Sequence, residues 1–99
     1  MQFDHLALNV KNIHGSVEWY RENLNAVVEY QDETWAMLNC GGIKIALTLD
    51  SQHPPHIAFR VDSISDFPEG CEIKQHRDGS WYYYDKDSSG NVIEWVKYD

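Results

Sequence analysis

The sequence has few basic residues and lacks long apolar runs. Eight Lys and Arg residues stand against sixteen Asp and Glu residues, which gives a formal net charge of −8. This charge repels phosphate backbones and anionic lipid surfaces. No stretch reaches the roughly 18 apolar residues of a membrane span, and the N-terminus lacks the pattern of a secretory leader. We therefore expect no nucleic-acid partner, no membrane partner and a cytoplasmic location.

Cysteine and proline are also scarce. Cys40 and Cys71 have no metal-type CxxC spacing around them, and in a reducing compartment they are expected to be free thiols. Two of the three prolines, Pro54 and Pro55, are adjacent in the polar segment 50–55. Consecutive prolines fix φ and remove backbone donors, so this segment should interrupt any regular structure.

The chain is long enough for one domain, and it repeats itself. Its 99 residues are 42% hydrophobic, which is enough apolar material for a core. Residues 5–13 (HLALNVKNI) recur as residues 56–64 (HIAFRVDSI), with His, Ala, Val and Ile identical. We predict a single domain, 1–99, built from two related modules at 1–50 and 55–99.

The first module has the order β-α-β-β-β. Residues 3–10 alternate between a packing face and a second face that carries His5, as in a strand. Residues 13–24 predict a helix, because Asn12 can cap it and Asn25 suits a left-handed C-terminal position. Its predicted apolar stripe is Ile13, Val17, Tyr20 and Leu24. Strands are predicted at 26–31, 34–40 and 43–49.

The second module repeats this order with a truncated helix. A strand is predicted at 56–61, followed by a crossover over 62–70 in which Pro68 and Gly70 leave room for one or two helical turns. Strands at about 71–76, 80–85 and 91–97 follow, with turn residues at 77–79 and 87–91 between them. The predicted fold class is therefore α+β.

With this organisation the chain resembles the vicinal oxygen chelate superfamily of glyoxalases, bleomycin-resistance proteins, fosfomycin-inactivating transferases and extradiol dioxygenases. The matching stretches are 3–8, 16–24, 55–62 and 84–95. The resemblance implies two βαβββ modules that form a curved eight-stranded mixed sheet, a half-open barrel, around a cleft.

The resemblance also implies a metal site at His5, His56 and Glu94. The two histidines occupy equivalent positions of the repeat and alternate with the packing residues of their strands, so both should face the cleft. Two imidazoles and a carboxylate suit a divalent ion such as Fe(II), Mn(II), Ni(II) or Zn(II). Such an ion would hold two adjacent substrate oxygens as a Lewis acid.

Ala46 bears on the type of reaction. Residues 42–47 align with 90–95, so Ala46 stands where Glu94 stands in the second module. Glyoxalases and related epimerases use a carboxylate there as a fourth ligand and base, so the resemblance favours a transferase or dioxygenase over a glyoxalase isomerase.

Several polar residues are candidates for substrate contact. Arg60 shares the histidines' side of its strand, and Thr48 flanks Ala46. Tyr84 matches a position where fosfomycin-type transferases present a tyrosine, and Tyr82 lies on its face. An alternative for residues 81–84 is an aromatic strand with only a structural role. The other three histidines, His14, His53 and His76, match no ligand position and are expected at the surface.

These observations leave two hypotheses for function. The first is a metal-dependent enzyme that acts on a small molecule with vicinal oxygens. The second is a metal-free ligand-binding or drug-sequestering module of the bleomycin-resistance kind, whose acidic composition would help to hold cationic drugs. A homodimer is expected in either case, because the truncated second helix leaves apolar sheet surface to cover.

Overall fold

A computed structural model describes residues 1–49 and 53–98. The predicted boundary segment 50–55 therefore lies partly outside the described residues. The elements are β1 (Gln2–Val10), α1 (Ile13–Leu24), β2 (Val27–Gln31), β3 (Trp35–Cys40), β4 (Ile43–Leu49), β5 (His56–Arg60), the 3₁₀ helix η1 (Ile64–Asp66), β6 (Lys74–Gln75), β7 (Trp81–Lys86) and β8 (Val92–Lys97). The predicted order of both modules is confirmed. Among these elements, no helix is long and apolar enough to cross a membrane.

The chain divides into two compact units. The N-terminal unit is His5–Pro55, and the C-terminal unit is Met1–Asp4 together with His56–Asp99. β1 contributes to both, since its first residues belong to the C-terminal unit. The strand order is β2-β3-β4-β1 in the N-terminal unit and β1-β5-β8-β7-β6 in the C-terminal unit. Each unit combines parallel and antiparallel pairs, as a mixed sheet requires.

Both predicted ends of α1 are confirmed. The Asn12 side chain accepts a hydrogen bond of 2.7 Å from the Gly15 N–H, which satisfies one of the free donors of the first turn. Asn25 adopts the left-handed conformation with φ of 52° and ends the helix.

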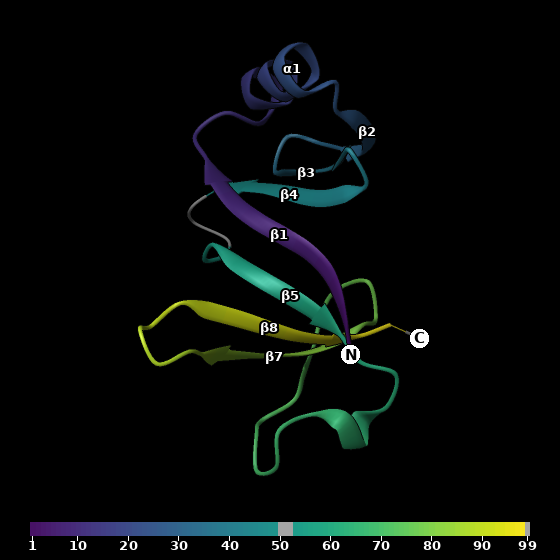
Figure 1. Ribbon diagram of the computed structural model, residues 1–99, viewed down its shortest axis with the longest axis vertical. Helices are drawn as coiled ribbons and strands as arrows, with labels where there is room; N and C mark the ends of the chain where they lie inside the picture. Colours follow the sequence, from purple (N-terminus) through teal and green to yellow (C-terminus); the bar gives the residue numbers. More distant parts are fainter. Residues whose placement is uncertain (50–52, 99) are drawn as a thin grey trace. The chain divides into compact units, whose positions relative to one another are not determined.

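The helix covers the core of the N-terminal unit. α1 contacts β2, β3 and β4, and Figure 1 shows it above β3 and β4. Ile13 and Val17 are buried in this core, whereas Leu24 is 47% exposed. The predicted stripe therefore ends at Tyr20, which packs against this core, and Leu24 is the last helical residue before the Asn25 cap. The other buried core residues are Ala26, Ala36, Leu38 and Leu47.

In the C-terminal unit, β8 lies between β5 and β7 (Figure 1). β5 and β8 run parallel with Ala58 opposite Glu94. The N-terminal unit repeats this register, since β1 and β4 run parallel with Ala7 opposite Ala46. The structure thus confirms that Ala46 is the equivalent of Glu94.

The second crossover is as short as predicted. η1 is a single 3₁₀ turn of three residues, which Ser63 and Asp66 cap reciprocally. After it, β6 has only two residues, in place of the strand predicted at 71–76. The reason is a turn in which the Cys71 N–H donates to the Pro68 carbonyl and Gly70 has a φ of 78°. This turn delays the start of the strand.

Candidate metal centre

Glu94 is a carboxylate buried in the middle of β8. It is 2% exposed, and its strand neighbours are Ala58 on β5 and Tyr84 on β7. A carboxylate at such a place is costly unless hydrogen bonds, an opposite charge or a metal ion compensates for the lost water. The side chains that contact Glu94 therefore indicate how its buried charge is compensated.

His56 is the first such side chain. It begins β5, is 7% exposed, and places Nε2 3.3 Å from Oε1 of Glu94. A hydrogen bond between an imidazolium and a carboxylate is usually shorter, about 2.7–2.9 Å. Two ligand atoms about 2.1 Å from one tetrahedral ion lie about 3.4 Å apart. The His56–Glu94 separation therefore fits a pair of ligands to the same ion.

His5 is the second buried histidine that the sequence singled out, and it is 9% exposed. The residue before it, Asp4, is held within the C-terminal unit. Tyr98 donates a hydrogen bond of 2.6 Å from its phenol to Oδ2 of Asp4, and a guanidinium nitrogen of Arg60 lies 3.9 Å from Oδ1. His5 is joined to this anchored residue by one peptide bond.

The three residues offer a suitable donor set. As the predicted ligands, His5, His56 and Glu94 would supply two imidazole nitrogens and a carboxylate oxygen, and each of the three is buried. This set suits Fe(II), Mn(II), Ni(II) and Zn(II), as predicted.

His76 contacts Glu94 as well, and the prediction of a surface position for it is wrong. Its Nε2 lies 2.7 Å from Oε2 of Glu94, and its side chain is only 23% exposed. The imidazole also stacks on Tyr82, with centroids 3.7 Å apart and planes at 12°. No spacing signal identified His76, because it follows the short β6 and has no counterpart in the first module.

The predicted tyrosines lie on the Glu94 face of the C-terminal unit. The Tyr84 ring is 5.2 Å from the His56 ring and 5.2 Å from the Tyr82 ring, measured between centroids. Burial raises the pKa of Tyr84 above its ordinary value, and the charges of Glu94 and Tyr82 raise it further. Tyr84 is therefore a protonated phenol at neutral pH.

The other two predicted contact residues, Thr48 and Arg60, each have hydrogen-bond or ion-pair partners. Thr48 is 6% exposed in the N-terminal unit, and its hydroxyl donates to Oδ1 of Asn9 at 3.0 Å. Arg60 belongs to the C-terminal unit, where it binds the Gln2 side chain in addition to Asp4. His14 is exposed, as predicted, while His53 is partly buried.

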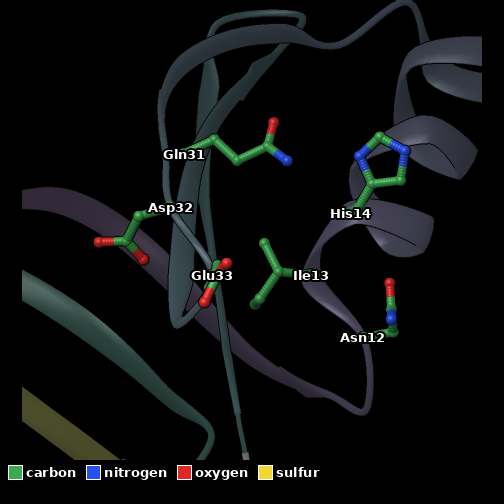
Figure 2. A pocket seen from close by; sticks show the side chains of 6 residues that line it. All are labelled: Asn12, Ile13, His14, Gln31, Asp32 and Glu33. Atoms are coloured by element: carbon green, nitrogen blue, oxygen red, sulfur yellow. The ribbon is translucent and has the colours of Figure 1, made fainter.

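A hollow in the N-terminal unit contains none of the predicted metal ligands or substrate-contact residues. It lies between the start of α1 and the turn after β2, where Asn12, His14 and Glu33 line it, together with Ile13, Gln31 and Asp32 (Figure 2). Asp32 accepts hydrogen bonds there from the Tyr30 phenol, the Thr34 hydroxyl and the Thr34 and Trp35 backbone N–H groups, which lower its pKa. These groups build the turn, so the candidate site remains the one around Glu94.

Comparison with known proteins gives a relative in sequence. The chain is 32% identical over 99 residues to the metallothiol transferase FosB of Staphylococcus epidermidis, and the match covers 92% of this chain. The chain spans 63% of the length of this curated relative.

Solved structures share the fold over nearly the whole chain. A superfamily member from Vibrio splendidus is 14% identical, with a TM-score of 0.70 over 97% of this chain and 98% of that one. An Mn(II)-bound glyoxalase from Novosphingobium aromaticivorans is 18% identical, with a TM-score of 0.66 over 96% of this chain and 37% of that one. These likenesses confirm the predicted fold class of two βαβββ modules with an eight-stranded mixed sheet.

The family itself follows from the sequence. Residues 2–73 match the family model described as Glyoxalase/Bleomycin resistance protein/Dioxygenase superfamily. This match spans most of the chain and includes the first strand, the helix and His56. The chain belongs to the glyoxalase/bleomycin resistance protein/dioxygenase superfamily.

Proposed function

We propose that this chain binds a divalent metal ion through His5, His56 and Glu94 and is a metal-dependent transferase for a small molecule with vicinal oxygens. The observation that carries the proposal is the 3.3 Å separation of His56 Nε2 and Glu94 Oε1, both buried. A relative that is a metallothiol transferase favours the transferase over the dioxygenase alternative. A fold neighbour with bound Mn(II) supports manganese as the first ion to test.

The residues around Glu94 have separable roles in this proposal. The bound ion supplies Lewis-acid stabilisation of charge on a substrate oxygen. Tyr84, kept protonated by its buried position, can donate its O–H to a substrate oxygen. Tyr82 offers an aromatic surface beside it. Thr48 and Arg60 remain predicted substrate contacts; binding would require Arg60 to leave Gln2 and Asp4.

The proposal also includes a cytoplasmic location and a homodimer. A reducing compartment agrees with Cys40 and Cys71, which are both unpaired. The homodimer is supported by exposed apolar side chains of the C-terminal unit, among them Phe3 and Ile57, in a unit whose crossover contains only the three-residue η1.

The metal site is tested by titrating untagged protein with Mn(II) and measuring the heat of binding by calorimetry. Wild-type protein should bind about one equivalent. The double variant His5→Ala/His56→Ala and the isosteric Glu94→Gln should each weaken binding more than about 100-fold, which exceeds the usual effect of an outer-shell residue. His14→Ala is the matched control, because it removes an exposed histidine. Near-stoichiometric binding by the double variant would show that the ligand set is wrong.

The second candidate is the metal-free binding module. The aromatic pair Tyr82 and Tyr84, together with the net charge of −8, favours a cationic aromatic ligand in that case. Two results together would support this function instead. The wild-type protein would bind such a cation but no Mn(II), and the Tyr82→Ala variant would no longer bind the cation.

A further inference from the structure

His76 has a defined place in the C-terminal unit, although it lies outside the proposed ligand set. It precedes the hairpin turn 77–79 between β6 and β7. The His76 N–H donates to the Ser80 carbonyl at 2.8 Å, and the Gly79 N–H donates to the His76 carbonyl at 3.0 Å. Gly79 has a φ of 93°, as this type of three-residue hairpin loop requires. The backbone therefore positions His76 independently of its side chain.

The imidazole is also held in one orientation. Its stack on Tyr82, at 3.7 Å and 12°, leaves Nε2 in the ring plane directed at Oε2 of Glu94, 2.7 Å away. A carboxylate oxygen accepts in such a contact, so the His76 Nε2–H donates. At this distance the hydrogen bond is among the short, strong ones that an ionised acceptor makes.

The two oxygens of Glu94 thus have different neighbours. Oε2 accepts from His76, whereas Oε1 lies 3.3 Å from Nε2 of His56. A carboxylate can bind an ion through one oxygen or both. An oxygen that already accepts a short hydrogen bond shares its charge and one lone pair with that donor, which makes it a weaker second ligand.

We propose that His76 is a positioning residue, which holds Oε2 of Glu94 so that Glu94 presents Oε1 alone to the divalent ion. This inference rests on the proposed metal-binding function and adds a residue to it. One-oxygen binding leaves a coordination position for a substrate oxygen, and the hydrogen bond fixes the direction in which Oε1 points.

The test compares two substitutions of His76. His76→Phe keeps an aromatic ring to stack on Tyr82 but has no donor, whereas His76→Gln keeps an N–H donor. Calorimetric titration with Mn(II) should show binding about 10–100-fold weaker in His76→Phe. Affinity in His76→Gln should be restored to near the wild-type value. His14→Phe serves as the control for a histidine-to-phenylalanine change on an exposed surface.

Infrared difference spectra, metal-loaded minus metal-free, provide a readout that a merely structural contact would not change. The symmetric and antisymmetric stretching bands of the Glu94 carboxylate are identified by their loss in Glu94→Gln. In the wild type, the separation of these two bands should be wide, as expected for binding through one oxygen. In His76→Phe the separation should narrow as Oε2 becomes free to bind.

The outcomes separate the two proposals. Wild-type protein that takes up no Mn(II) overturns both. If wild-type protein binds Mn(II) and His76→Phe matches its affinity and band separation, only the role of His76 is overturned, even if the metal-free variant melts at a lower temperature. Equal weakening by His76→Phe and His76→Gln would show that the donor is not the cause. Weaker binding without a change in band separation would exclude one-oxygen binding as the reason.

Discussion

Ala46 bears on the type of reaction that we expect of this chain. In the register of the two units, Ala46 stands opposite Ala7 just as Glu94 stands opposite Ala58. A proton transfer between adjacent carbons needs a base within hydrogen-bond reach of the substrate C–H. A methyl group cannot accept a proton. Thr48, the nearest hydroxyl on the same strand face, is a weak base and donates to Asn9.

We therefore predict that wild-type protein loaded with Ni(II) or Zn(II) does not isomerise the methylglyoxal–glutathione adduct. Ala46→Glu should bind metal more tightly through a fourth ligand. Without metal this variant should melt at a lower temperature, because Ala46 is only 5% exposed and a buried carboxylate is costly. Absorbance assays and thermal melts measure both effects. Robust isomerisation by the wild type, abolished by Glu94→Gln, would show that another residue supplies the base.

At the scale of elements, the turn between β7 and β8 depends on one carboxylate. Oδ1 of Asp87 accepts from the Ser89 and Asn91 N–H groups, each at 2.9 Å, and Oδ2 accepts from the Asn91 side chain at 2.9 Å. The Asn91 side chain is the largest cause of the lowered pKa of Asp87, followed by the backbone donors. This turn joins the strands that carry Tyr84 and Glu94.

Asp87→Ala should lower the melting temperature at pH 7. Because the pKa of Asp87 is lowered on folding, its contribution to stability is complete above the unfolded value of about 4. It is lost as the pH falls through the lower folded pKa. The difference between wild type and variant should therefore shrink below about pH 4. Melts at several pH values measure this effect, with Glu69→Ala, at an exposed position, as the control. A difference that does not change with pH would contradict this role.

At the scale of the whole molecule, we expect the shortened crossover to affect assembly. Along β5 the buried residues His56 and Ala58 alternate with Ile57, which is 37% exposed. Phe59 is the next residue along β5 on the same face as Ile57. The ring of Phe3, which is 47% exposed, packs edge-on against the ring of Phe59. An outer face of apolar and aromatic side chains is typical of a protein interface.

We predict that the protein sediments as a homodimer at micromolar concentration. Ile57→Glu should shift the equilibrium toward monomer, because a charge would be buried in the interface. Val27→Glu, on the exposed edge strand β2, is the matched control and should remain dimeric. A wild-type monomer at high micromolar concentration would rule out this assembly.

The sequence by itself determined the features that depend on neighbouring residues. Asn12 and Asn25 mark the ends of α1 because capping involves only a few adjacent positions. The repeat of His5 in His56 identified equivalent strands, and their alternation predicted that both histidines lie on the face opposite to the packing residues. The alignment of residues 42–47 with 90–95 identified Ala46 as the equivalent of Glu94, and the matching strand registers of the two units confirm it.

Only the tertiary structure decided which distant side chains meet. His76 lies 18 positions from Glu94 and reaches it because the β6–β7 hairpin brings its ring over Tyr82. Arg60 pairs with Asp4 because the first residues of β1 belong to the C-terminal unit. Neither contact follows from periodicity or local spacing, since each depends on how separate strands pack together.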